Sequence, residues 1–410
     1  MKKLIQITMI ALLIFGSVKL TAGTYSGGGG INGNPYKIAT VADLIELSNT
    51  PADWSNTFIQ TADIVFNSDH TLQDWDGDGN PGPAEGFLPI GNNSHFFASR
   101  YNGQNHTISN LYINRPTTDY VALFGKVNSA GNGAMENIHL INATVIGHDY
   151  VGGLIGFNPY YVYCCSSTGS ITGANNVGGL IGWDYNATTR YCSSAANVTG
   201  TGTGTGSLEG NVGGLIGLYG DLNVWDCYAT GNVTGFKDVG GFAGRLTVCC
   251  GNETLRCYST GNASGTVGVG GFAGEAHADN TSIQFCYSTG NASGTDKVGG
   301  FVGYHNTFSY SNRIDNCYSL GNVTRSSGTN TSFGGFCGTM RDGHILSCYS
   351  IGKVYQSPGI IWTSGGANQG FIGKLVLDEG YILTLVGNLY DMNASQQTYG
   401  GGHMQRQLLK

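Results

Sequence analysis

Two short phrases recur along this chain of 410 residues and decide its fold. One copy of the first is Val239-Gly-Gly-Phe-Ala-Gly244, and one copy of the second is Cys257-Tyr-Ser-Thr-Gly-Asn-Ala-Ser-Gly265. Extra residues fall between the phrases, so insertions are confined to loops. A repeat of about 30 residues is typical of units that stack on one another, because one unit cannot bury a core alone. Copies of the first phrase begin 26 to 35 residues apart, at Val151, Val177, Val212, Val239, Val269, Val298 and Phe333.

The composition agrees with a mostly β chain whose short strands are separated by glycines. Glycine supplies 68 of the 410 residues, charged residues are only 11 %, and hydrophobic residues are 40 %. A disordered chain needs high charge and few aromatic residues, and collagen needs glycine at every third position with abundant proline. Neither class fits this chain.

Each repeat holds short β-type segments separated by Gly-Asn turns. Glycine permits a positive φ, and asparagine tolerates the left-handed region, so the chain turns at fixed places. Parallel pairing between coils at about 4.8 Å then gives an all-β solenoid. Thr40-Val-Ala-Asp43 followed by an apolar face predicts a short helix that caps the N-terminal end.

The first phrase resembles the GLUG motif of secreted and surface proteins of bacteria, as in Gly153-Leu-Ile-Gly156 and Gly241-Phe-Ala-Gly244. The lead-in 34–44, the stretch 101–111 and the ending 390–397 resemble that family too. The resemblance implies a right-handed parallel β-helix of roughly 30-residue repeats on the cell surface or outside the cell. It implies an adhesin-like role and little about activity.

The chain divides into four parts on these signals. Residues 1–23 read as a signal peptide, because Lys2 and Lys3 precede an apolar stretch that is too short for a membrane span. Residues 24–119 form an N-terminal cap and first coils, 120–391 the GLUG-repeat solenoid, and 392–410 a tail. We expect no transmembrane segment after signal cleavage, because no second apolar run of that length follows. We also expect no binding of nucleic acid, since the net charge is −7 and no basic patch is present.

An acidic loop at residues 74–85 has the ligand spacing of a calcium-binding loop. Asp74, Asp76, Asp78, Asn80 and Glu85 offer oxygens at positions 1, 3, 5, 7 and 12. Calcium, in a structural role, is the predicted cofactor. The alternative is a polar turn that happens to be acidic.

The second phrase predicts two columns of stacked side chains, because successive residues of a strand face opposite ways. The cysteines would form an inward column of free thiols, whereas Cys164, Cys249, Cys250 and Cys337 lie off the column and are disulfide candidates, particularly Cys249 or Cys250 with Cys257. The tyrosines would form an outward column that is either a ligand face for sugar rings or a stabilised coil edge. The column cysteines are Cys165, Cys192, Cys227, Cys257, Cys286, Cys317 and Cys348; the tyrosines are Tyr228, Tyr258, Tyr287, Tyr318 and Tyr349.

These observations favour a non-enzymatic secreted or cell-surface repeat protein that serves adhesion, interaction or scaffolding. Its partner would be an extracellular protein or glycan. The alternative is a parallel β-helix that binds or degrades polysaccharide as a lyase or hydrolase. The solenoid also predicts that Gly241 and Gly271 resist replacement by valine, whereas Gly204 accepts it.

Overall fold

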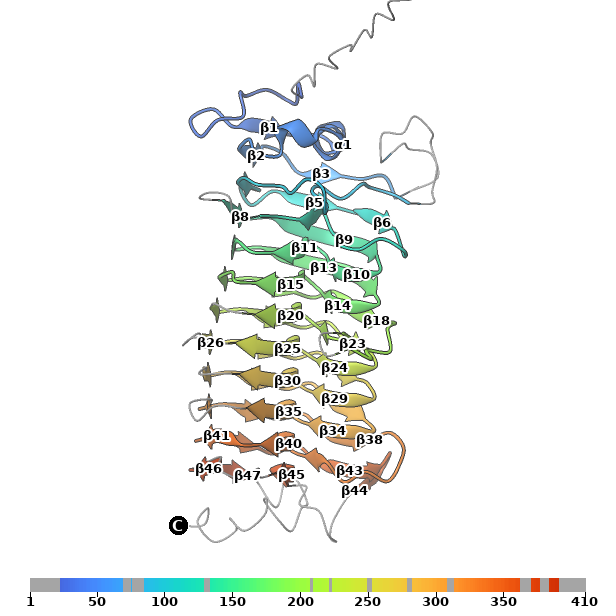
Figure 1. Cartoon of the computed structure of the whole chain (residues 1–410), viewed down its shortest axis with the longest axis vertical. Helices are drawn as coiled ribbons and strands as arrows, with labels where there is room; N and C mark the ends of the chain where they lie inside the picture. Colours follow the sequence, from blue (N-terminus) through green and yellow to red (C-terminus); the bar gives the residue numbers. More distant parts are fainter. Residues whose placement is uncertain are drawn as a thin grey trace, which may run out of the picture.

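The computed structural model describes residues 23–68, 75, 85–128, 133–206, 209–220, 223–248, 253–278, 282–307, 313–361, 370–376 and 383–390. In these residues the chain forms a parallel β-solenoid of about eight turns (Figure 1). Hydrogen-bonded neighbours in each sheet come from successive coils, and every strand pair except β43 with β44 is parallel. The predicted fold class is confirmed.

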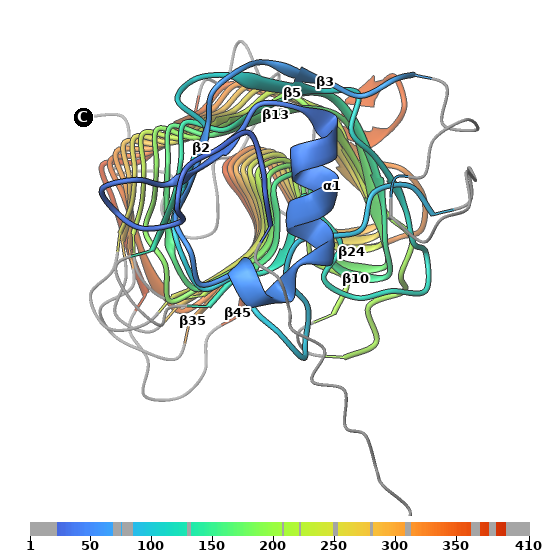
Figure 2. The same ribbon diagram turned by 90° about the horizontal axis from the view of Figure 1, so that it is seen from above.

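One coil passes through four sheets. It begins in a seven-stranded sheet and continues through a nine-stranded, a twelve-stranded and a fourth sheet before the next coil starts. Seen from the N-terminal end, these sheets follow one another clockwise as the coil recedes, so the solenoid is right-handed (Figure 2).

The first two sheets carry the repeated glycine phrase. The seven-stranded sheet consists of β10 (Asp149–Gly152), β14 (Asn175–Gly178), β19 (Val212–Gly213), β24 (Lys237–Gly240), β29 (Val267–Gly270), β34 (Asp296–Gly299) and β39 (Phe333–Gly334). The nine-stranded sheet consists of β7 (Phe124–Lys126), β11 (Ile155–Asn158), β15 (Ile181–Tyr185), β20 (Ile216–Gly220), β25 (Ala243–Val248), β30 (Ala273–Ala278), β35 (Val302–Thr307), β40 (Cys337–Arg341) and β45 (Ile372–Val376).

The other two sheets close the coil. The twelve-stranded sheet consists of β1 (Tyr36–Ile38), β2 (Phe58–Gln60), β4 (Tyr101–Asn102), β8 (Ala134–Glu136), β12 (Tyr161–Tyr163), β16 (Thr189–Arg190), β21 (Val224–Trp225), β26 (Glu253–Leu255), β31 (Ser282–Gln284), β36 (Arg313–Asp315), β41 (Gly343–Leu346) and β46 (Leu383–Val386). The fourth sheet consists of β3 (Ile64–Val65), β5 (Thr107–Ser109), β6 (Tyr112–Asn114), β9 (His139–Ile146), β13 (Ser166–Gly173), β17 (Ser193–Ser194), β18 (Asn197–Gly200), β22 (Tyr228–Ala229), β23 (Val233–Thr234), β27 (Tyr258–Ser259), β28 (Ala263–Ser264), β32 (Tyr287–Ser288), β33 (Ala292–Gly294), β37 (Tyr318–Ser319), β38 (Val323–Arg325), β42 (Tyr349–Ser350), β43 (Val354–Ser357), β44 (Ile360–Ile361) and β47 (Leu389–Tyr390).

Helix α1 (Val41–Asn49) lies across the N-terminal end of the coil and covers its core (Figure 2). The Asp43 backbone N–H donates to the Thr40 hydroxyl at 3.1 Å, and the Asp43 carboxylate accepts from the Thr40 N–H at 2.9 Å. Leu44 and Leu47 are fully buried beneath the helix. The predicted capping helix is confirmed, and a 3-10 turn, η1 (Pro51–Asp53), follows it.

The core consists of identical side chains stacked from coil to coil. Five phenylalanines of the first phrase stack with ring centroids 4.7–4.9 Å apart and interplanar angles of 2–9°. Each ring is at most 3 % exposed, so burial and aromatic stacking both stabilise the column. The five are Phe242, Phe272, Phe301, Phe336 and Phe371.

The glycines of the first phrase form a bend at which the chain folds back toward the core. A Cβ added to Gly241 would lie 2.2 Å from the Gly271 carbonyl oxygen of the next coil. A Cβ added to Gly244 would lie 2.3 Å from the Val212 nitrogen of the preceding coil. Both positions are therefore closed to any side chain. The bend places the outward side of the nine-stranded sheet against the start of the seven-stranded sheet.

Candidate functional site

The predicted tyrosine column points outward along the fourth sheet. Its neighbouring ring centroids lie 4.8–5.0 Å apart with interplanar angles of 1–9°. The end rings, Tyr228 and Tyr349, are 38 % and 39 % exposed, and the three central rings are half-buried. Because the central rings cover one another's faces, a ligand on this column would meet ring edges and hydroxyl groups rather than flat aromatic faces.

An asparagine ladder runs beside the tyrosines and has a structural role. The backbone N–H of Asn262 donates to the Asn232 side-chain oxygen at 3.0 Å, and that of Asn291 donates to the Asn262 side-chain oxygen at 2.9 Å. The same bond links Asn322 to Asn291. Turn chemistry therefore accounts for these repeated asparagines.

The cysteine column points inward, as predicted, and its seven members are free and buried. The backbone N–H of Cys257 donates to the Cys286 sulfur at 3.4 Å, and the Cys257 thiol donates to the Leu255 carbonyl oxygen at 3.4 Å. Burial raises the pKa of the Cys257 thiol. Two of the disulfide candidates, Cys164 and Cys337, are also free thiols, while Cys249 and Cys250 lie outside the described residues.

The predicted calcium loop falls largely outside the described residues, since Asp74, Asp76, Asp78 and Asn80 are not among them. The remaining ligand, Glu85, is an exposed side chain that forms an ion pair with Arg115. The calcium site stays a prediction.

Beyond the cysteine and tyrosine columns, sequence reasoning missed a further column of side chains, which lies at the bend formed by the glycines of the first phrase. We call it the corner column; each member follows the last glycine of a phrase by one residue, and all members pair in register along the nine-stranded sheet. The position repeats but the residue type changes, so a search for identical residues passes over it. The corner column comprises Phe157, Trp183, Leu218, Arg245, Glu275, Tyr304, Thr339 and Lys374.

The N-terminal part of the corner column is aromatic. Trp183 stacks on Tyr150 with ring centroids 5.4 Å apart and meets Phe157 edge-on at 5.1 Å. The Lys126 ammonium lies 4.6 Å from the Tyr120 ring centroid and 5.1 Å from that of Phe157. These rings are half-buried, so part of each is open to solvent.

The middle of the corner column holds buried charge. The Glu275 carboxylate lies 3.8 Å from the Arg245 guanidinium and 3.4 Å from the His277 ring. Asp238 is only 3 % exposed and lies 3.8 Å from the Lys237 ammonium. Burial, helped by the Glu275 charge, raises the pKa of Asp238 to about 7.

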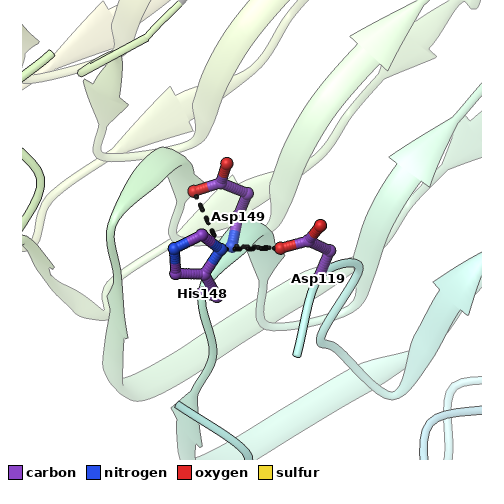
Figure 3. A group of neighbouring side chains, drawn as sticks. All are labelled: Asp119, His148 and Asp149. Atoms are coloured by element: carbon purple, nitrogen blue, oxygen red, sulfur yellow. Dashed lines mark hydrogen bonds and ion pairs between the residues drawn. The ribbon is translucent and has the colours of Figure 1, made fainter. Parts of the chain in front are cut away.

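A separate exposed group at the start of the solenoid has the donor types of a metal site (Figure 3). The His148 Nδ1 atom lies 2.8 Å from an Asp119 oxygen and 3.6 Å from an Asp149 oxygen. The hydrogen bond to Asp119 raises the pKa of His148. Three such ligands could hold a divalent cation, but the hydrogen bonds within the group already account for its geometry.

No family model matches the chain, so the GLUG assignment remains a resemblance. The chain is similar to halomucin of Haloquadratum walsbyi, with 36 % identity over 176 residues, which are 42 % of this chain and 2 % of that protein. It is also similar to a protein of Evansella cellulosilytica provisionally named a Gly-rich membrane protein, with 30 % identity over 162 residues, or 38 % of this chain and 17 % of that protein. The chain thus spans a small share of the length of both relatives.

A solved structure from Bacteroides ovatus, provisionally named an immunoglobulin A1 protease, shares 19 % identity and a TM-score of 0.41 over 89 % of this chain and 88 % of that chain. A likeness of this size carries no argument about activity. Among the described residues, no helix has the length and apolar character needed to cross a membrane.

Proposed function

We propose that this protein is a non-enzymatic interaction module at the cell surface or outside the cell, where it serves adhesion or scaffolding. The names of the relatives, a halomucin and a membrane protein, support this location. The stacked coils support the role, because a rigid rod presents the same kind of surface over a long distance.

The observation that carries the proposal is the distribution of groups along the corner column. Its aromatic end is partly open to solvent, whereas Glu275 is only 6 % exposed and is engaged by Arg245 and His277. An acid–base pair for glycoside cleavage must reach the scissile bond. A polymer lying on this face would meet rings and ammonium groups, which bind, and not Glu275 or Asp238.

The test is a binding and turnover assay in the same wells. The purified protein is applied to arrayed glycans and matrix proteins, and soluble products are measured alongside retention. We expect retention without products. Trp183→Ala should weaken binding about tenfold or more, because aromatic anchors dominate such contacts, whereas Tyr161→Ala, at a 60 % exposed site on β12, should not. Turnover would favour the lyase or hydrolase alternative, and no retention on any surface would contradict the proposal.

A further inference from the structure

A polar pocket lies at the C-terminal end of the corner column. Its volume is about 320 Å³, roughly ten times the volume that one water molecule takes in the liquid. Three corner-column residues that pair in successive coils, Tyr304, Thr339 and Lys374, form one wall. The loop 329–332, with three hydroxyl side chains and one amide, also lines the pocket.

The pocket carries an excess of positive charge. Two ammonium groups line it, those of Lys297 and Lys374, against one carboxylate, that of Asp296. The Lys297 ammonium lies 3.8 Å from the Tyr304 ring centroid, so a cation–π contact holds it over the ring. Lys374 is exposed at the rim. This excess stands out in a chain whose net charge is −7.

One hydroxyl in the pocket wall has no partner in the described residues. Thr339 is 3 % exposed, and its Oγ1 atom makes no hydrogen bond there. A buried hydroxyl without a partner costs about 1–3 kcal/mol. Because the Oγ1 atom has almost no accessible surface, an occupant of the pocket would remove this cost if the Thr339 side chain turned toward it.

We propose that this pocket binds a hexuronic acid unit, a sugar that carries one carboxylate and several hydroxyl groups. The carboxylate would lie between the Lys297 and Lys374 ammonium groups, and the sugar hydroxyls would bond to Thr339 and to the loop 329–332. The volume is far larger than a simple inorganic anion needs, and a neutral sugar would leave the one excess ammonium charge without a counter-charge, because Asp296 balances only one of the two. The inference deepens the proposed function, on which it rests, by naming the class of ligand at one end of the corner column.

The experiment is isothermal titration of the purified protein with methyl glucuronide, and with methyl glucoside as the matched neutral sugar. We expect binding of the acid sugar alone, weakened about tenfold by Lys374→Met, which removes a charge-assisted hydrogen bond. Lys353→Met, which changes a lysine outside the pocket, should leave binding unchanged. Thr339→Val should also weaken binding while keeping the thermal midpoint or raising it, since valine removes an unpaired hydroxyl.

Several results would overturn the inference. Full competition by acetate or sulfate at equal concentration would mean a simple anion site. Persistence of glucuronide binding in both pocket variants would mean that the sugar lies elsewhere, and loss of stability in Thr339→Val would mean that the hydroxyl is paired. A polyuronate that binds as tightly as the monosaccharide supports the inference and identifies a polymer as the source; binding of the monosaccharide alone supports it with a free sugar as the source. Failure at the pocket is distinguishable from failure of the proposed function, because retention on the arrays is measured independently.

Discussion

Replacing one glycine of the bend by alanine tests the packing of the coils most sharply. In Gly241→Ala the new Cβ would lie 2.2 Å from the Gly271 carbonyl oxygen, although side-chain Cβ atoms essentially never come within 3.0 Å of such an atom. Two successive coils must separate there by about 0.8 Å. The Gly241 N–H to Gly270 oxygen bond, already 3.2 Å long, would then approach 4 Å and be lost.

The expected cost follows from these distances. Overpacking a tight site costs about 1–3 kcal/mol, and the lost backbone hydrogen bond adds about 1 kcal/mol, so we expect destabilisation of about 3 kcal/mol. The matched control is Gly220→Ala in β20, where the nearest atom would be Tyr185 Cδ2 at an ordinary 3.6 Å. That control should change stability by less than about 0.5 kcal/mol.

Two measurements test this prediction. Urea unfolding gives the free energy of unfolding, and hydrogen exchange of the native protein gives the protection of the coils on either side of residue 241. Because coils interact mainly with their neighbours, protection should fall there and persist in distant coils. Equal stability of Gly241→Ala and Gly220→Ala would refute the reasoning about the bend.

Four further predictions concern a buried carboxylate, a buried thiol, the tyrosine column and the acidic loop. Burial and the Glu275 charge raise the pKa of Asp238 to about 7, so its contribution to folding stability is complete below pH 4 and is lost as the pH rises through 7. In urea titrations, Asp238→Asn should therefore be more stable than the wild type at pH 8, by up to about 4 kcal/mol, and equally stable at pH 4. The buried thiol of Cys257 should resist iodoacetamide in the folded protein and react in urea, as peptide mass mapping would show, and modification at equal rates would mean that the column is exposed. Tyr287→Phe should keep the midpoint of thermal unfolding whereas Tyr287→Ala should lower it, because Tyr287 contacts its neighbours in the column by ring stacking. Equal midpoints for the two variants would mean that the stacked rings do not stabilise the protein. If the loop 74–85 binds calcium, titration of the protein with calcium should give a heat of binding, and Glu85→Gln should reduce that heat. No heat of binding in the wild type would contradict the predicted calcium site.

The repeat phrases predicted the architecture because identical residues recur at identical places in the coil. The inward cysteines and outward tyrosines followed from strand alternation alone, and the capping box at Thr40 and Asp43 predicted α1. The prediction that Gly204 accepts valine is wrong. Its φ is +58°, and an added Cβ would lie 2.9 Å from the Gly210 Cα atom, so a loop glycine can be as constrained as a repeat glycine.

The corner column and its pocket could not be predicted in the same way. Trp183, Glu275 and Lys374 share one position in the coil but no chemistry, so no repeated residue signals that position. Each corner-column side chain lies next to the start of the seven-stranded sheet only because of the bend, and the glycines of the phrase indicate a bend but not its direction. The pocket also needs the loop 329–332, which belongs to one of the longer insertions between phrases.

Simultaneous measurement of retention and product release by the purified protein, on arrayed polysaccharides and matrix proteins, tests most directly whether this solenoid binds without catalysis. We expect retention on at least one of these surfaces, weakened by Trp183→Ala but not by Tyr161→Ala, with no soluble product. Release of oligosaccharide at a rate that scales with protein concentration would contradict the central claim that this solenoid binds without catalysis.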